Sequence, residues 1–353
     1  MDGHGGPRVV NGYTLLTEAG RGMFCTVTWA EDQAGQRCAV KVFDRYVLAN
    51  REVAHFDAAG ASRVPLQTRI DEELRILGGL RHPNVVALRE VIDEPARPQL
   101  YAVMEGLVGG QLMDWSEELS AYSATSRQES VRQLWGDQVQ LAAAVDDRAL
   151  VYREVVAAFL FRQLLSAVEH LHGLSIIHKD LKPDNILLTL PPPSGDPRFV
   201  APLDLSAWPA LRAPAEGAGD ARPLLDPARF LAKIGDFNTA VTGTEPDCLI
   251  YDAEGTQMFT PPECFSGGTG DGIRGKPRDM WSLGCVLFAM LFGRCPFQQE
   301  LPIMLQLSIL SDALVVPGGI ATASAESLLQ ELLQKEPSQR PTAEAALRHE
   351  WLQ

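Results

Sequence analysis

Strand-like patterns of apolar and polar residues occupy three stretches in the first third of the chain. Residues 13–30 and 37–43 alternate and carry β-branched or aromatic side chains, as strands do. Residues 100–114 begin as a continuous apolar run and then break into a glycine-containing connector. The pattern therefore predicts a set of strands that ends near residue 105.

Helical spacing appears in three other stretches. Within 71–86, leucines recur at this spacing, and the H-P-N-V-V sequence ends the helix and opens a strand. A long helix is predicted over 151–172, with an apolar face formed by Val155, Phe159, Leu164, Val168 and Leu171. The apolar run at 280–293 has 14 residues, which is too short to cross a bilayer and predicts a buried helix.

Three segments interrupt these patterns. Residues 45–65 look long and irregular, and residues 115–150 are polar at first and then weakly helical, which indicates an insertion at the surface. The segment 191–229 is rich in proline, alanine and glycine and cannot bury enough apolar surface to order itself, so disorder is expected. A passive spacer is favoured there over a proline-rich docking ligand.

Composition limits the class of protein. The 353 residues suit two lobes or two domains, and the 46% hydrophobic residues allow a sizeable core. The formal net charge of −14 argues against nucleic acid or an anionic membrane as a partner, although a basic peptide substrate is compatible with it. The first residues lack the basic and apolar regions of a signal peptide. The six cysteines form no C-x-x-C pair, so reduced thiols in a cytoplasmic protein are expected.

The most informative stretch is 177–188, which reads I-H-K-D-L-K-P-D-N-I-L-L. Asp180, Lys182 and Asn185 lie between an apolar pair and an apolar run. Phosphoryl transfer needs a carboxylate that orients a hydroxyl group, a cation near the moving phosphate, and a side-chain oxygen for Mg²⁺. For this motif alone, the alternative is a chance D-x-K-x-x-N in an amphipathic loop.

At every polar position the stretch resembles the catalytic loop of protein kinases, H-x-D-x-K-x-x-N. Together with the motifs below, it makes the chain similar to serine/threonine protein kinases. The resemblance implies an α+β, two-lobed fold, with a small β-rich lobe that contains one regulatory helix and a large, mostly helical lobe. After a tail at 1–12, the kinase domain is expected at 13–353, with a small lobe at 13–104, a hinge at 105–110 and a large lobe at 111–353.

The resemblance assigns catalytic and metal-binding roles. It implies Asp180 as the catalytic base, Lys182 as the cation that faces the phosphate, and Asn185 as a metal ligand. The K-I-G-D-F-N sequence at 233–238 resembles the D-F-G metal motif and implies Asp236 as a second Mg²⁺ ligand. Asn238 replaces the glycine of that motif, and we expect the turn to survive because asparagine tolerates positive φ.

A nucleotide site is implied by two further motifs. The G-R-G-M-F-C-T-V sequence at 20–27 resembles the glycine-rich loop that covers the phosphates of ATP, with Cys25 in place of the third glycine. C-A-V-K resembles the strand of the phosphate-binding lysine, Lys41, whose expected partner is Glu73, with Glu72 as the fallback. The implied ATP-binding residues are Gly20, Gly22, Val27, Ala39, Lys41, Met104, Glu105, Leu107 and Leu187.

The sequence after the metal motif resembles the activation segment of kinases with peptide substrates. In G-T-Q-M-F-T-P-P-E, Thr256 is expected to hydrogen-bond near Asp180 and Lys182. We also expect Glu263 to pair with Arg340, and Asp279 to anchor the backbone of the catalytic loop.

The residue before the catalytic aspartate is unusual. Activation by loop phosphorylation usually works through an arginine at this position. Here it is Lys179, which cannot make the bidentate contact with phosphate. We therefore expect activity to depend only weakly on phosphorylation of Thr242 and Thr244.

Within the family, the E-E-L-R-I-L-G-G-L-R-H-P-N-V-V and G-R-C-P-F sequences look most like calcium/calmodulin-dependent kinase kinases, which phosphorylate the activation loops of other kinases. The resemblance implies Mg·ATP-dependent transfer to a serine or threonine of a protein, with another kinase as a candidate substrate. No calmodulin-binding tail is evident.

Two other function classes remain open. A pseudokinase acting as a nucleotide-binding scaffold or allosteric module is the main alternative, and Cys25, Lys179 and Asn238 favour it. A small-molecule kinase is disfavoured by the P-P-E sequence. We favour catalysis because six expected functional residues are all present: Lys41, Glu73, Asp180, Lys182, Asn185 and Asp236.

Overall fold

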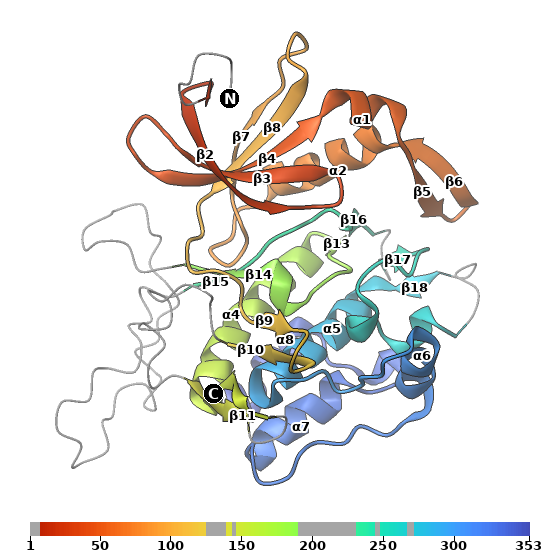
Figure 1. Ribbon diagram of the computed structural model, residues 1–353. Coiled ribbons are helices and arrows are strands. Elements are labelled where there is room, and N and C mark those ends of the chain that lie inside the picture. The colour runs from red at the N-terminus through yellow and green to blue at the C-terminus, as the bar shows by residue number, and fades with distance from the viewer. Residues whose placement is uncertain (1–7, 125–138, 143–145, 190–230, 244–247, 267–271) are drawn as a thin grey trace, which may run out of the picture.

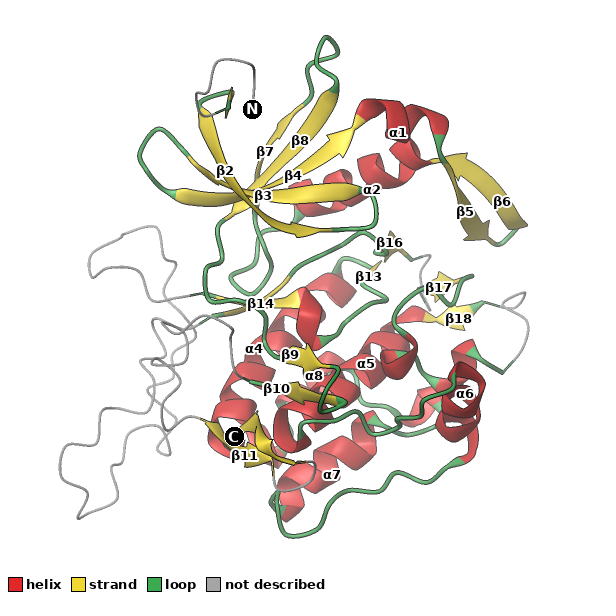
Figure 2. Ribbon diagram, viewed as in Figure 1, coloured by secondary structure: helices red, strands yellow, loops and turns green. Residues whose placement is uncertain are grey.

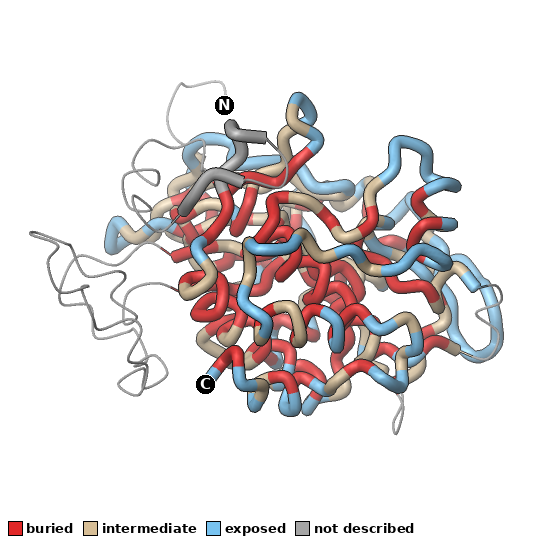
Figure 3. Tube along the Cα trace, turned by 90° about the horizontal axis from the view of Figure 1, so that it is seen from below, coloured by how far each residue is buried: buried red, intermediate tan, exposed pale blue. Residues whose placement is uncertain are grey.

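The structure, a computed structural model, describes residues 8–124, 139–142, 146–189, 231–243, 248–266 and 272–353. Strands gather at one end of the molecule and most helices at the other (Figures 1 and 2). Buried residues fill the interior, and exposed residues follow the outer turns (Figure 3). The predicted insertion at 191–229 and residues 1–7 of the predicted tail lie outside the described residues.

A six-stranded antiparallel sheet forms one lobe, in the order β1-β2-β3-β4-β8-β7. Its strands are β1 (Val9–Val10), β2 (Tyr13–Arg21), β3 (Cys25–Glu31), β4 (Arg37–Asp44), β7 (Leu88–Ile92) and β8 (Gln99–Glu105). In β4, Cys38 and Val40 are buried in a cluster with residues of β8. Because side chains alternate along a strand, Ala39 and Lys41 lie together on the other face of the sheet.

Helix α2 (Leu66–Gly79) packs against this lobe and begins before the predicted residue 71. Its buried positions follow one helical face: Leu66, Ile70, Glu73, Ile76 and Leu77. Glu73 is the only charged side chain in that stripe and is 2% exposed. A charged group this deeply buried needs a partner of opposite charge.

The segment 45–65 is ordered, so the expectation of an irregular segment was wrong. It forms α1 (Arg45–Asn50) and a hairpin of β5 (Glu52–Asp57) and β6 (Gly60–Pro65). The carboxylate of Asp44 caps α1 by accepting hydrogen bonds from the backbone N–H groups of Tyr46 and Val47. Gly60, at φ +116°, supplies the backbone conformation of the hairpin turn.

Two long helices form the centre of the helical lobe. They are α4 (Glu154–Gly173) and α5 (Gly275–Phe292), which contains the apolar run predicted to be a buried helix. Gly293, at φ 74°, ends α5 with a left-handed cap. The shorter helices are α6 (Pro302–Ser311), α7 (Ala323–Leu332) and α8 (Ala343–Leu347).

Residues 115–150 differ from the prediction of a weakly helical surface insertion. Their described parts form β9 (Asp114–Ser116), β10 (Ala121–Ser123), β11 (Val139–Ala142) and the start of β12 (Asp146–Tyr152). Tyr122 is buried, and its ring packs edge-on against Trp115 and Phe259. The alternation in these strands is too short to show in the sequence. Helix α4 begins at Glu154 and not at the predicted residue 151, because β12 extends to Tyr152.

Short strand pairs bring the catalytic stretch and the metal motif together. β14 (Ile186–Leu188) pairs with β15 (Ala232–Ile234), although a long segment separates them in the sequence. β13 (Ile176–Ile177) pairs with β16 (Val241–Thr242), and β17 (Leu249–Ile250) pairs with β18 (Ile273–Arg274). These pairs hold residues 177–188 and 233–238 side by side beneath the sheet.

Candidate active site

A cavity of about 580 Å³ lies between the sheet and the helical lobe. Each residue predicted to bind ATP lines it: Gly20, Gly22, Val27, Ala39, Lys41, Met104, Glu105, Leu107 and Leu187. Further lining residues were not predicted from the sequence, among them Val86, Gly110 and Gln111. Val86 packs with Met104 and Leu107, and its position as the last residue of the H-P-N-V-V sequence was the available signal.

Lys41 joins the sheet to both α2 and the metal motif. Its Nζ lies 2.6 Å from Glu73 Oε1 and 3.0 Å from Asp236 Oδ1. Burial alone would lower the pKa of Lys41, but the charges of Glu73 and Asp236 outweigh it and raise the pKa. Glu72, the fallback partner, pairs with Arg75 instead. The buried stripe of α2 decides between the two glutamates, because only Glu73 lies on it.

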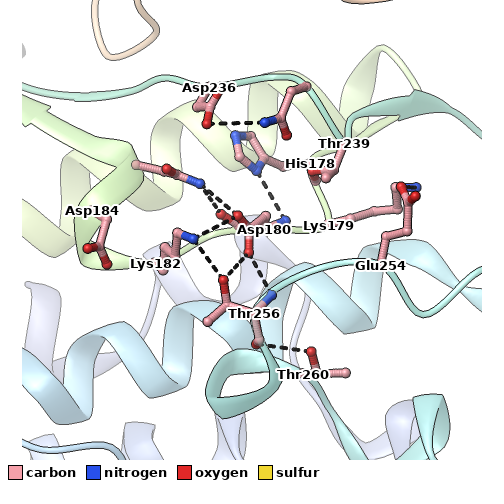
Figure 4. A network of polar contacts seen from close by, with 12 residues as sticks. His178, Lys179, Asp180, Lys182, Asp184, Asp236, Thr239, Glu254, Thr256 and Thr260 are labelled. Carbon is pink, nitrogen blue, oxygen red and sulfur yellow. Dashed lines mark hydrogen bonds and ion pairs between the residues drawn. The ribbon is translucent and has the colours of Figure 1, made fainter. Parts of the chain in front are cut away.

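Asp180 is held by three neighbours (Figure 4). Its Oδ1 accepts hydrogen bonds of 2.8 Å from both the backbone N–H and the hydroxyl of Thr256. Its Oδ2 lies 3.1 Å from Lys182 Nζ and 3.0 Å from Asn185 Nδ2. Burial would raise the pKa of Asp180, but Lys182 and the Thr256 hydrogen bonds outweigh it and lower the pKa. The carboxylate is therefore charged at neutral pH and fixed in orientation.

The oxygens of Asn185 and Asp236 suit a hard divalent cation. Asn185 uses its Nδ2 to donate to Asp180, which leaves its Oδ1 as an acceptor. Asp236 also lines the cavity. Within the described residues, no group of three or more His, Cys, Asp and Glu side chains could hold a metal alone. Water and phosphate oxygens would complete the shell of an ion bound here, as is common for Mg²⁺.

The backbone of the metal motif differs from the expectation that Asn238 has a positive φ. The residue with positive φ is Asp236, at 55°, whereas Asn238 does not have positive φ. Asn238 instead donates a hydrogen bond of 3.3 Å from Nδ2 to Asp236 Oδ2. The substitution of glycine is therefore tolerated because this turn does not need a left-handed residue at position 238.

Buried groups fix the backbone of the catalytic loop from below. Asp279 accepts hydrogen bonds from the backbone N–H groups of His178, at 2.9 Å, and Lys179, at 3.0 Å. Its Oδ2 also lies 3.1 Å from His172 Nε2. Lys179 has a positive φ of 68°, a conformation that costs free energy without such support. His178 packs edge-on against the buried ring of Phe237, which belongs to the metal motif.

The activation segment lies against the same loop. Lys182 donates a hydrogen bond of 2.8 Å to Thr256 Oγ1. Gly255, at φ +135°, passes so close to the catalytic loop that a Cβ atom would lie 2.7 Å from the carbonyl oxygen of Lys179. Further along, the carboxylate of Glu263 and the buried guanidinium of Arg340 form two hydrogen bonds of 2.6 and 2.7 Å. These contacts hold Thr256 within hydrogen-bonding distance of Asp180.

Comparison with known proteins identifies the family to which this chain belongs. Residues 13–352 match the protein kinase domain, and the chain belongs to that family. The predicted α+β kinase fold, with a sheet lobe and a helical lobe, is confirmed.

The similar proteins are serine/threonine kinases. The chain is 26% identical to the serine/threonine-protein kinase GRIK2 of Arabidopsis thaliana, over 98% of this chain and 67% of that protein. It is 26% identical to a calcium/calmodulin-dependent protein kinase kinase of Caenorhabditis elegans, over 97% of this chain and 53% of that protein. The serine/threonine-protein kinase ssp1 of Schizosaccharomyces pombe is also 26% identical, over 99% of this chain and 44% of that protein. The chain thus spans about two thirds of the first of these relatives, about half of the second and less than half of the third.

These matches confirm the resemblance to serine/threonine protein kinases, a calcium/calmodulin-dependent kinase kinase among them. Protein kinases act on protein substrates and use ATP with a divalent cation. None of the helices described here is long and apolar enough to span a membrane.

Proposed function

We propose that the chain is an active serine/threonine protein kinase that transfers the γ-phosphate of Mg·ATP to a protein hydroxyl. The observation that carries this proposal is the position of the Asp180 carboxylate, which Lys182, Asn185 and Thr256 hold in one orientation. The Lys41–Glu73 pair lies in the adjoining cavity. Protein kinases need both parts in place together.

In this proposal each residue has a separate task. Asp180 orients the substrate hydroxyl and accepts its proton as the oxygen bonds to the γ-phosphorus and the bond to ADP breaks. Lys182 faces the moving phosphate, and Lys41 binds the α- and β-phosphates. Asn185 and Asp236 would hold Mg²⁺, which neutralises charge on the phosphate oxygens when bound.

The adenine end of the cavity supports nucleotide binding. Apolar side chains of Val27, Ala39 and Leu187 line it, together with Met104 before the connector. The side chain of Glu105 accepts from the backbone N–H of Ala87 at 2.8 Å and pairs with Lys233. These contacts fix the connector, so that the carbonyl of Glu105 and the backbone of Leu107 can contact the adenine ring.

We further propose that the protein substrate is another kinase and that the chain acts in the cytoplasm. The name of the relative from Caenorhabditis elegans supports another kinase as the protein substrate. All six cysteines are thiols and not disulfides, and four of them are buried, which supports a reducing compartment such as the cytoplasm. The observations do not support the pseudokinase alternative. Five of the six functional residues line one cavity, and the sixth, Asp180, contacts Lys182 and Asn185.

The test is phosphate transfer from labelled ATP, with Mg²⁺, to a generic basic protein and to the chain itself. Asp180→Asn should lower the rate by about 10²- to 10⁴-fold, because the substrate proton loses its acceptor. Asp71→Asn, at an exposed position of α2, is the matched control and should leave the rate unchanged. If folded wild type binds ATP without transferring phosphate, the pseudokinase alternative replaces this proposal.

A further inference from the structure

Glu254 lies where the activation segment passes between α2 and the catalytic loop. Arg69 of α2 donates two hydrogen bonds to its carboxylate, of 2.9 and 2.6 Å. On the other side, Lys179 Nζ lies 3.7 Å from Glu254 Oε2. Figure 4 shows Glu254 beside Lys179, and in the sequence Glu254 lies two residues before Thr256. One carboxylate therefore contacts cations from both lobes.

Arg69 also contacts the start of the same segment. Its Nε donates a hydrogen bond of 3.0 Å to the backbone carbonyl of Asn238. Arg69 and Glu73 are four residues apart, so both project from the same side of α2. Contacts of Arg69 with the segment thus favour the position of α2 in which Glu73 reaches Lys41.

Asp252 supplies the second carboxylate of this cluster. Lys179 Nζ lies 2.7 Å from Asp252 Oδ2, and the Lys179 side chain is 2% exposed. Burial lowers the pKa of Lys179, and the charge of Asp252 opposes that change. The buried guanidinium of Arg278 donates to the backbone carbonyls of Asp252, Lys179 and Glu254. Each cation of the cluster therefore has acceptors within the unmodified chain.

Added phosphate is not needed to complete this cluster. Kinase activation loops are commonly ordered when a phosphate group pairs with arginine side chains. Thr242, one residue predicted as a phosphorylation site, is exposed, and its hydroxyl accepts from Arg75 at 3.0 Å. It is not hydrogen-bonded to Lys179, Arg69 or Arg278. The other predicted site, Thr244, lies outside the described residues.

We propose that Asp252 and Glu254 are built-in counter-charges that hold the activation segment in its catalytic arrangement without phosphorylation. Arg69 and Lys179 are positioning residues that act through Glu254, Asp252 and Thr256. This inference rests on the proposed kinase activity, and it names how that activity is maintained. Loss of the Glu254 charge frees the segment from α2 and allows Thr256 to leave Asp180.

The first experiment removes phosphate from the loop. Wild type treated with phosphatase, and a Thr242→Ala/Thr244→Ala variant, should both transfer phosphate at a rate within about twofold of untreated wild type. Loss of activity in either sample, with the protein still folded, would overturn the proposal, because it would show that phosphate is required.

The second experiment removes the counter-charge. Glu254→Gln and Arg69→Met should each lower kcat by about tenfold, a loss expected for one charge-assisted contact. The double variant should lose clearly less than the product of the two single losses, because both single variants remove the Arg69–Glu254 pair. Arg69→Lys keeps the charge and should recover most of the activity. Glu344→Gln, in an exposed pair on α8, is the control and should behave as wild type. An unchanged kcat in Glu254→Gln would contradict the proposal. A double variant whose loss of kcat equals the product of the two single losses would also contradict it.

A third measurement separates this inference from the proposed function. Hydrogen exchange of the backbone amides at 248–256 should become at least about tenfold faster in Glu254→Gln than in Glu344→Gln. The measurement does not need catalysis, so it tests the counter-charges even if wild type transfers no phosphate. Unchanged exchange would show that Glu254 does not hold the segment.

Discussion

Lys41 Nζ lies 3.0 Å from Asp236 Oδ1, although the two residues are 195 positions apart in the sequence. The same nitrogen lies 2.6 Å from Glu73 Oε1. Lys41 therefore connects three parts of the molecule, the sheet, α2 and the metal motif. A nucleotide in the adjoining cavity would meet an ammonium group whose position is set from two sides.

Glu73→Gln should reduce kcat about 10- to 100-fold, because Lys41 loses the charge that holds it opposite Asp236 and misplaced groups are costly in catalysis. Steady-state kinetics with a peptide substrate measure the change. Glu72→Gln is the matched control, since Glu72 pairs with exposed Arg75, and it should retain nearly full activity. A larger loss in Glu72→Gln than in Glu73→Gln would contradict the assignment.

Asn238→Gly should lower the Mg²⁺ concentration needed for half-maximal activity by about two- to tenfold. The Asn238 amide donates to Asp236 Oδ2 and competes with a cation for that oxygen, and one hydrogen bond has a modest net free energy. Titration of activity with Mg²⁺ at saturating ATP measures the shift. Asn238→Ala removes the amide without adding glycine flexibility and should give a similar shift. If only the glycine variant responds, backbone freedom is the cause.

Cys25 should react slowly with iodoacetamide at pH 7.5. Burial raises the pKa of this thiol, although Lys41 opposes the change, so the reactive thiolate is scarce at neutral pH. Alkylation followed by mass spectrometry should be slower than in a cysteine peptide and should still be rising at pH 9. Mg·ATP should slow it further, because Cys25 lines the cavity. Alkylation as fast as that of the peptide would contradict this prediction.

Arg340→Leu should lower the free energy of unfolding by about 3 kcal/mol, because it leaves the half-buried carboxylate of Glu263 without its partner. Urea unfolding followed by fluorescence measures this change. Arg348→Leu removes an equivalent side chain from an exposed pair on α8 and should cost no more than about 0.5 kcal/mol. Equal losses in the two variants would show that burial of the Arg340 pair is not what matters.

Local spacing was enough to predict the residues around the cavity. Asp180, Lys182 and Asn185 lie within six consecutive residues, and their spacing is set by the short distances over which they must meet one phosphate. The strand pattern around Lys41 and the leucine spacing before H-P-N likewise identified β4 and α2. Each of these signals is contained in a window no longer than one secondary-structure element.

Other features depend on contacts that no short window contains. The buried position of Tyr122 and the ordered hairpin of β5 and β6 were missed because short strands carry too little alternation to be recognised. Arg69 and Glu254 are 185 residues apart, and their pairing depends on how α2 packs above the activation segment. The amino-acid sequence by itself determined the family, the fold class and the candidate catalytic residues. The tertiary structure alone decided the pairs that no motif contains, Arg69 with Glu254 and Lys179 with Asp252, because ion pairs act over a few ångströms in space regardless of separation along the chain.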